Sequence, residues 1–445
     1  MATSRAVPNL AFRRLRGQRS PGEFAAAVRR AAREIGEQVA CDARYIGRVE
    51  SGEIRCPNYA YERVFLHMFP GLSLTDLGFV AREHVRGRGA RAAVAAAPAP
   101  EITTRNDEES DVLRRAFMTG GTATVAAASL GIGGLGPIPA PRAGDRFGEA
   151  EVNAVEEAVR RIRLLDDRHG ADGLYRKAAE PLRAAYALLD SGRATRQSTA
   201  DRMHAGTGEL ALSVGWLAHD SGRLEDARSH YAEALATARV AGDPALEAHA
   251  FSNTSFLARD AGKYREAVRA AQAGQRAGKH LSSARLLALL TLREAGGWAG
   301  LGDRAACEEA LGRAHTLFGR GPCDADPEWM SFFGEPEVEA LEAQCWSALG
   351  DWARAARHAH RATVLSSSHF ARNLALYRAQ LAADLARGGR LEEAAAAGER
   401  VLDLLGEVRS SRIRAMLTET VRLLAPHHGT PPVAAFLDRR ATLGA

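Results

Sequence analysis

A six-residue phrase that begins with glycine recurs five times along the second half of this 445-residue chain. The copies are Gly222–Ala227, Gly262–Ala267, Gly302–Cys307, Gly350–Ala355 and Gly389–Ala394, and their starts lie 40, 40, 48 and 39 residues apart. Glycine can end a helix because a positive φ has no steric cost for it, and a new helix can begin after the polar residue that follows. Such spacing is typical of stacked helical repeats rather than of a catalytic motif.

Small residues recur seven positions before each glycine and five and twelve positions after it. These positions hold Gly215, Ala227 and Ala234; Ser255, Ala267 and Gly274; Ala295, Cys307 and Ala314; Ala343, Ala355 and Ala362; and, in the fifth copy, Ala382, Ala394 and the larger Val401. Small side chains let paired helices approach closely. The pattern resembles the tetratricopeptide (TPR) repeat, whose usual period is about 34 residues, so helices longer by roughly a turn are expected here. An irregular alanine-rich helical bundle is the alternative.

The composition favours helices and places positive charge at one end of the chain. Hydrophobic residues make up 46%, enough for real cores, and almost no segment alternates with period two, so nearly no sheet is expected. Residues 1–95 carry a net charge of +7, from 16 arginines and 9 acidic residues, whereas the whole chain carries +5 and the remainder therefore −2. A positive end domain is typical of a protein that binds a polyanion.

Residues 9–79 predict five or so short helices, and one of them has a distinctive exposed face. Asp42 is a suitable N-cap, Gly52 ends this helix, and Ile46 and Val49 lie together on its buried side. The opposite side carries only small residues and arginines: Ala43, Arg44, Gly47 and Arg48. A helix of this kind can enter the major groove of DNA, where arginine pairs bidentately with guanine.

An earlier helix is predicted to begin at Ser20, which with Glu23 forms a capping box. Together with the phrase Tyr45–Gly52, this arrangement resembles the Cro/C1-type (XRE-type) helix-turn-helix domain. The resemblance implies double-stranded DNA as a partner, and it assigns contacts with DNA to Asp42, Arg44, Tyr45 and Arg48 and positions near phosphates to Arg55 and Asn58. The connection before Cys41 is longer than in the compact family domain, so the second helix is expected to be lengthened, with its end open at 35–39. A small protein-interaction module with a solvated arginine face is the alternative.

Residues 84–148 are rich in alanine, glycine and proline and are interpreted as a flexible linker. Within them Arg114-Arg115 and the weakly apolar stretch that follows look like a twin-arginine export signal. Because export signals act at the N-terminus and this stretch is rich in glycine, a linker helix packed on the repeats is favoured over export or membrane association. The first 19 residues lack the apolar core of a signal peptide, and the five cysteines lack metal-binding spacing, so a cytoplasmic protein is expected.

No sequence motif for catalysis is found. The chain lacks HExxH, GxxxxGK[ST] and GxSxG, and no GxGxxG follows a predicted strand, so we expect no enzyme activity, no metal site and no cofactor. Asp166 and Asp167 stand close to His169, which could suggest acid–base chemistry. We interpret them instead as the charged end of a helix that Gly170 caps.

The predicted architecture is therefore all-α: a small helix-turn-helix domain at 1–83, the linker at 84–148, a TPR-like α-solenoid at 149–425 and a C-terminal helix or tail at 426–445. This combination resembles a group of actinobacterial transcriptional regulators. The resemblance implies a homodimer whose repeat groove binds a peptide, small molecule or protein. Because no stretch resembles a transmembrane helix, no membrane contact is expected. Polar residues predicted to face this groove are His249, Ser252, Asn253, Arg259, Arg293, Gln344 and Gln380. They can pair with a peptide backbone or carboxylate, or simply be solvated. A cytosolic TPR scaffold without specific DNA binding is the alternative.

Overall fold

The computed structural model describes residues 8–17, 19–35, 37, 39, 41–52, 54–57, 59–79, 146–191, 193–366 and 370–444. Asn58, the Arg114-Arg115 segment and nearly all of the predicted linker lie outside the described residues. The described part is almost entirely helical, and its two strands are only two residues long: β1 (Arg146–Phe147) pairs in parallel with β2 (Arg193–Ala194). The prediction of an all-α protein with nearly no sheet is confirmed.

The N-terminal part contains four α-helices in its described residues, where five or so were predicted: α1 (Leu10–Arg16), α2 (Pro21–Glu34), α3 (Ala43–Glu50) and α4 (Tyr59–Met68). Their core is aromatic, since the rings of Phe12 and Phe65 lie 5.0 Å apart and both are fully buried. The predicted capping box is present: the Glu23 backbone N–H donates to the Ser20 hydroxyl (3.2 Å), and the Ser20 N–H donates to the Glu23 carboxylate (2.8 Å). Helix α2 spans 14 residues and ends immediately before the range 35–39 that the sequence left open.

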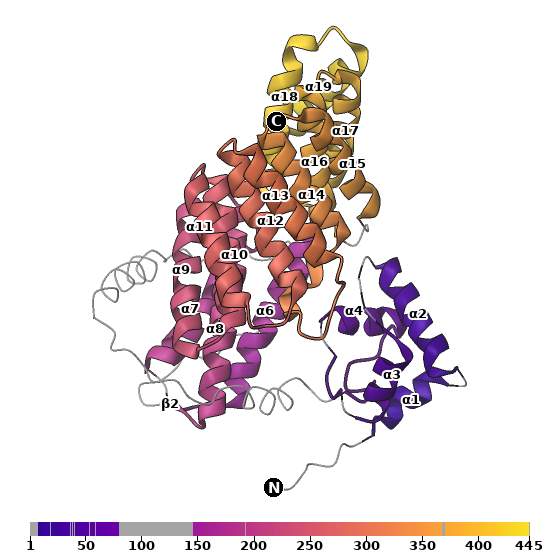
Figure 1. The fold of residues 1–445 in the computed structure, drawn as a ribbon, viewed down its shortest axis with the longest axis vertical. Coiled ribbons are helices and arrows are strands. Elements are labelled where there is room, and N and C mark those ends of the chain that lie inside the picture. The colour runs from indigo at the N-terminus through magenta and orange to yellow at the C-terminus, as the bar shows by residue number, and fades with distance from the viewer. Residues whose placement is uncertain are drawn as a thin grey trace.

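The rest of the chain forms a stack of antiparallel helices (Figure 1). In order these are α6 (Glu149–His169), α7 (Tyr175–Ser191), α8 (Gln197–Asp220), α9 (Leu224–Ala241), α10 (Pro244–Asp260), α11 (Tyr264–Gly278), α12 (Ala284–Gly300), α13 (Arg304–Phe318), α14 (Glu335–Ala348), α15 (Trp352–Leu365), α16 (Ala371–Arg387), α17 (Leu391–Leu404), α18 (Ser411–Leu424) and α19 (Pro431–Gly444). Helix follows helix with short turns, and chain neighbours pack together, as in a TPR-like α-solenoid.

The repeated glycines make the joints between these helices. Gly222, Gly262, Gly302, Gly350 and Gly389 have φ of 74°, 72°, 76°, 75° and 75°, in the left-handed region that favours glycine. The small residues between the joints set how closely the helices pack. A Cβ atom at position 215 would lie 2.6 Å from Cε1 of Tyr231, closer than van der Waals contact allows. The predicted repeat is therefore confirmed. Its physical causes are the left-handed glycine at each joint and the small residues where the helices meet.

The array curls back on itself, so that its first helix contacts its last ones. The Arg409 N–H donates to the His169 carbonyl (2.8 Å) just before α18 begins. Arg372 of α16 donates to Asp220 of α8 (2.7 Å), across 152 residues of sequence. Helix α6 also packs along α16. The inner face is consequently a partly open cavity, narrower than the extended concave groove that the sequence predicts.

An additional segment occupies residues 319–334, where the repeat interval is 48 rather than 40 residues. It contains the short 3-10 helix η3 (Glu328–Phe332), which contacts α4 of the N-terminal part. A second 3-10 helix, η4 (Ala425–His427), joins α18 to α19. Within the ranges that the structure describes, no helix is both long and apolar enough to cross a membrane.

Candidate ligand cavity

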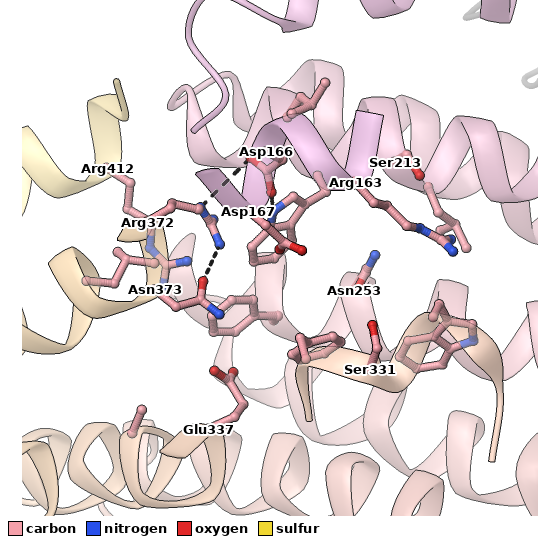
Figure 2. Close-up of a pocket in the computed structure, with 18 of the residues that line it drawn as sticks. Arg163, Asp166, Asp167, Ser213, Asn253, Ser331, Glu337, Arg372, Asn373 and Arg412 are labelled. Atoms are coloured by element: carbon pink, nitrogen blue, oxygen red, sulfur yellow. Dashed lines mark hydrogen bonds and ion pairs between the residues drawn. The ribbon is translucent and has the colours of Figure 1, made fainter. Parts of the chain in front are cut away.

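The cavity lies inside the array and measures about 1340 Å³, including the part open to solvent. Helices α6, α8, α10, α12, α14, α16 and α18 contribute to its wall, together with η3 and Arg63 of α4. Its aromatic lining consists of Trp216, Phe256, Trp329, Phe332 and Tyr377. Figure 2 shows Asp167 and Asn253 directed toward the same open space. An apolar wall with a few convergent polar groups is typical of a small-molecule or peptide site.

Four array arginines line this cavity, and three of them have acidic partners. Arg163 binds Glu209, Arg372 binds Asp220, and Arg412 of α18 lies 3.2 Å from Asp260 of α10. The exception, Arg293 of α12, is 5% exposed, and its Nε and Nη1 atoms are buried without a hydrogen-bond partner among the described residues. Its guanidinium carbon lies 3.9 Å from the centre of the Phe256 ring. Burial lowers the pKa of Arg293 to about 10.

The acidic groups around the cavity differ in charge state. Burial raises the pKa of Asp166 to about 7, although Arg372 opposes the shift; its carboxylate also accepts a hydrogen bond from Trp216 Nε1 (3.0 Å). Burial disfavours charge on Glu209 as well, but His249 and Arg163 outweigh it and lower its pKa to about 2. Glu209, which pairs with the cavity residues Arg163 and His249, is therefore stabilised as a carboxylate, whereas burial disfavours the charged form of Asp166.

The structure brings five of the seven predicted groove residues to the cavity wall: His249, Asn253, Arg293, Gln344 and Gln380. Ser252 and Arg259 are not part of this lining; Ser252 is 1% exposed within α10, and Arg259 donates to Gln344. The side chain of Gln380 donates to Asp384 (2.9 Å).

Two groups of cavity residues were missed or misinterpreted from the sequence. Asp166 and Asp167 are not simply the charged end of a helix, because both line the cavity and Asp166 is 6% exposed, although Gly170 caps the helix as predicted. Trp329 and Phe332 come from η3, inside the longest repeat interval. That interval of 48 residues was the available sequence signal for an inserted functional segment.

The residues assigned to DNA contact lie on and beside α3. Asp42 and Arg44 are exposed, and Asp42 caps the helix by accepting from the Tyr45 N–H (2.7 Å). Tyr45 is 8% exposed and its ring stacks on Tyr61 at 4.0 Å, so its assignment to DNA contact is wrong in this arrangement. The cause is a packing partner on α4 that fills the space under the ring.

Two further residues that were assigned to the DNA surface are Arg48 and Arg55. Arg48 Nη1 lies 3.0 Å from the carboxylate of Asp324, which belongs to the inserted segment 319–334. Arg55 is exposed.

One arginine of the N-terminal part reaches the cavity. Arg63 of α4 forms ion pairs with Glu37 and with Asp167 of α6, the latter at 3.6 Å, and lies 5.5 Å from the Phe370 ring centre. Burial raises the pKa of Glu37 to about 7 despite the charge of Arg63. The N-terminal helices are thus docked against the cavity wall.

Comparison with known proteins assigns no family. No family model and no curated protein matches this chain. Among solved structures, the crystal structure of BtubC (BKLC) from P. vanneervenii is 17% identical, covers 56% of this chain and 92% of its own, and gives a TM-score of 0.36. A Rap protein complexed with competence and sporulation factor is 12% identical, covers 65% of this chain and 94% of its own, and gives a TM-score of 0.40. Similarities this weak carry no functional assignment.

Proposed function

We propose that this protein is a DNA-binding transcriptional regulator whose helical array binds a ligand that modulates it. The observation that carries the proposal is the docking of the N-terminal helices on the cavity wall. Arg63 of α4 lines the same cavity as Arg293 of the array. A ligand in the cavity would therefore contact, or lie next to, the part of the chain that we assign to DNA.

Support for DNA binding comes from charge and from exposure. Arg44 and Arg55 are exposed near the start and beyond the end of α3, and Gly47 adds no side chain between them that would block approach. The net charge of +7 on residues 1–95 favours a polyanion. Because specific operators of helix-turn-helix proteins usually have two half-sites, we propose that a homodimer binds DNA. The role proposed is binding, without catalysis or a cofactor.

Ligand and DNA would be coupled through the contacts between α3, α4 and the array. A ligand changes DNA affinity only if it favours one arrangement of the N-terminal helices over another. Coupling between two sites of this kind is typically about 1–3 kcal/mol, which changes affinity roughly 5- to 150-fold. Asp324 and Trp329 lie in one inserted segment, so movement of the cavity wall would act directly on the partner of Arg48.

The test is binding of the full-length protein to the DNA that a tagged copy occupies in its own cells. Arg44→Ala should weaken binding by about 1–3 kcal/mol and relax the preference at one base pair. Arg265→Ala, an exposed arginine on α11, serves as the matched control and should leave binding unchanged. Unaltered affinity in the Arg44→Ala/Arg48→Ala double variant would contradict the assignment of α3.

A cytosolic interaction scaffold without specific DNA binding is the second candidate. The observation in its favour is that Arg48 already has a protein partner, Asp324, in the described structure. If a tagged copy enriches no DNA sequence and instead co-purifies with a protein through residues 1–83, the scaffold is the correct interpretation.

A further inference from the structure

We infer that the cavity binds its ligand through an anionic oxygen group, a carboxylate, held by Arg293, with the apolar body of the ligand against the aromatic wall. This inference specifies the ligand half of the proposed function and does not depend on DNA binding. The shared chemistry fits a small organic acid or the C-terminus of a short peptide.

The first argument is the state of Arg293 itself. A guanidinium has five N–H donors, and buried charges in folded proteins are normally paired with acids or fully hydrogen-bonded. Arg293 is 5% exposed, and two of its nitrogens lack a partner among the described residues. Its guanidinium carbon lies over the Phe256 ring, 3.9 Å from the ring centre, so an approaching group meets the edge of the guanidinium rather than its covered face. An edge of this kind matches the two oxygens of a carboxylate.

The second argument is the local charge. Three arginines surround the Phe256 ring, with Arg259, Arg293 and Arg412 at 4.4, 3.9 and 4.7 Å from its centre. Asp260 lies 2.5 Å from Arg259 and 3.2 Å from Arg412 and serves both. This single carboxylate balances one of the three positive charges, so the cluster favours a ligand anion and repels a cationic ligand.

The acid with the largest electrostatic effect on Arg293, Glu337, has a hydrogen-bond partner of its own. Glu337 lines the same cavity and its charge favours the protonated form of Arg293. Its carboxylate, however, accepts a hydrogen bond from the Tyr377 hydroxyl at 2.7 Å. Glu337 therefore stabilises the charge of Arg293 from a distance and leaves the donors of the guanidinium to the ligand.

The third argument is the aromatic wall of the cavity. His249 stacks on Trp329 with ring centres 3.7 Å apart, and the indole Nε1 of Trp329 is a second buried donor without a hydrogen-bond partner among the described residues. The ligand is thus expected to offer at least one more acceptor beyond its carboxylate.

The inference is tested by thermal unfolding of the full-length protein with matched acids and amides at millimolar concentration. The first pair is indole-3-acetate and indole-3-acetamide; the second is the dipeptide N-acetyl-leucyl-phenylalanine with a free carboxylate and with a C-terminal amide. A rise in Tm with an acid but not with its amide supports the carboxylate site, and the pair that responds identifies the source as a small acid or a peptide terminus. Equal shifts within each pair, or no shift with either acid, would overturn it.

Arg293→Met provides the second test and separates a binding role from a structural one. Replacing a buried charge that has no hydrogen-bonded partner by an apolar side chain should leave the ligand-free Tm unchanged or raised. The same variant should bind the responding acid about tenfold more weakly or worse, because a charged hydrogen bond is lost. Arg265→Met, an exposed arginine on α11, should change neither quantity. A lower ligand-free Tm in Arg293→Met, or unaltered acid binding, would show that Arg293 is structural and would refute the inference. Both tests are made without DNA, so their failure is distinct from failure of the DNA-binding proposal.

Discussion

Replacement of Arg372 by methionine should open the ring of contacts that closes the array. Arg372 lies on α16 and is 4% exposed. It donates to Asp220 of α8 (2.7 Å), lies 3.9 Å from Asp166 of α6, and its guanidinium carbon is 4.8 Å from the Trp216 ring. Methionine keeps part of the side-chain volume but removes the charge that both carboxylates face.

The expected cost follows from the burial of those carboxylates. The side chain of Asp220 is 0% exposed and that of Asp166 is 9% exposed, so neither can be solvated after Arg372 is lost. Removing one partner of a buried ion pair typically destabilises a protein by about 3–5 kcal/mol. For an array of nearly 300 residues, with an unfolding entropy of about 2.1 cal/mol/K per residue, that corresponds to a fall in Tm of about 5–8 °C.

The dependence on pH distinguishes this cause from a simple loss of packing. Arg372 lowers the pKa of both Asp166 and Asp220, so the variant should raise both pKa values in the folded protein. When the pKa of a carboxyl is higher in the folded than in the unfolded protein, the contribution of that carboxyl to stability is complete at low pH. It is lost as the pH rises through the folded-state pKa. The deficit of Arg372→Met should therefore be larger at pH 8 than at pH 5, and Asp220→Asn in the same chain should recover part of it.

The assay is circular dichroism during thermal unfolding of the full-length protein at both pH values. Arg422→Met is the control, because Arg422 pairs with Glu419 (2.7 Å) on the surface of α18 and its side chain is 70% exposed. The control should match the wild-type Tm. A Tm for Arg372→Met within 2 °C of the wild-type value, where about 5 °C or more is expected, would refute the argument that closure rests on this buried cluster. A deficit that does not depend on pH would refute it as well.

Two further predictions concern the N-terminal contact and acid stability. Asp324→Asn should raise DNA affinity by at most about fivefold, because its ion pair with Arg48 is exposed and worth about 1 kcal/mol or less. Fluorescence anisotropy measures the affinity, and the increase should vanish in an Arg48→Ala background. Burial lowers the pKa of His230 to about 4, so lowering the pH from 7 to 5 should cost about 2 kcal/mol through this ring. His230→Phe should remove that part of the loss in denaturant titrations, and parallel curves for variant and wild type would contradict it.

The repeat could be predicted from the sequence because its causes are local. Gly222 ends a helix through its own φ, and Gly215 sets helix spacing through the missing Cβ, so both appear at fixed offsets in the chain. The closure of the array could not be predicted in this way. It depends on Arg372 and Asp220, which are 152 residues apart and belong to no repeated phrase.

The residues of the candidate site could likewise be predicted only where they follow the repeat. His249 and Arg293 were predicted to face inward because each lies on the first helix of its pair, and the register of the repeat assigns that helix to the inner face. Tyr45 was assigned wrongly because the resemblance describes only which helix meets DNA, whereas the orientation of a ring depends on its neighbour, here Tyr61. Trp329 was missed because no repeat pattern extends into an insertion.

The insertion at 319–334 gives a physical reason for the proposed coupling to be adjustable. Within it, Trp329 packs on His249 in the cavity wall, and Asp324 pairs with Arg48 of α3. The Arg48 and Asp324 side chains are 38% and 71% exposed, so this contact is weak in water. A ligand that favours another position of η3 by about 1–3 kcal/mol is sufficient to break it. The buried Arg372 cluster, at about 3–5 kcal/mol, would survive the same ligand, so the array can stay closed while the N-terminal helices are released.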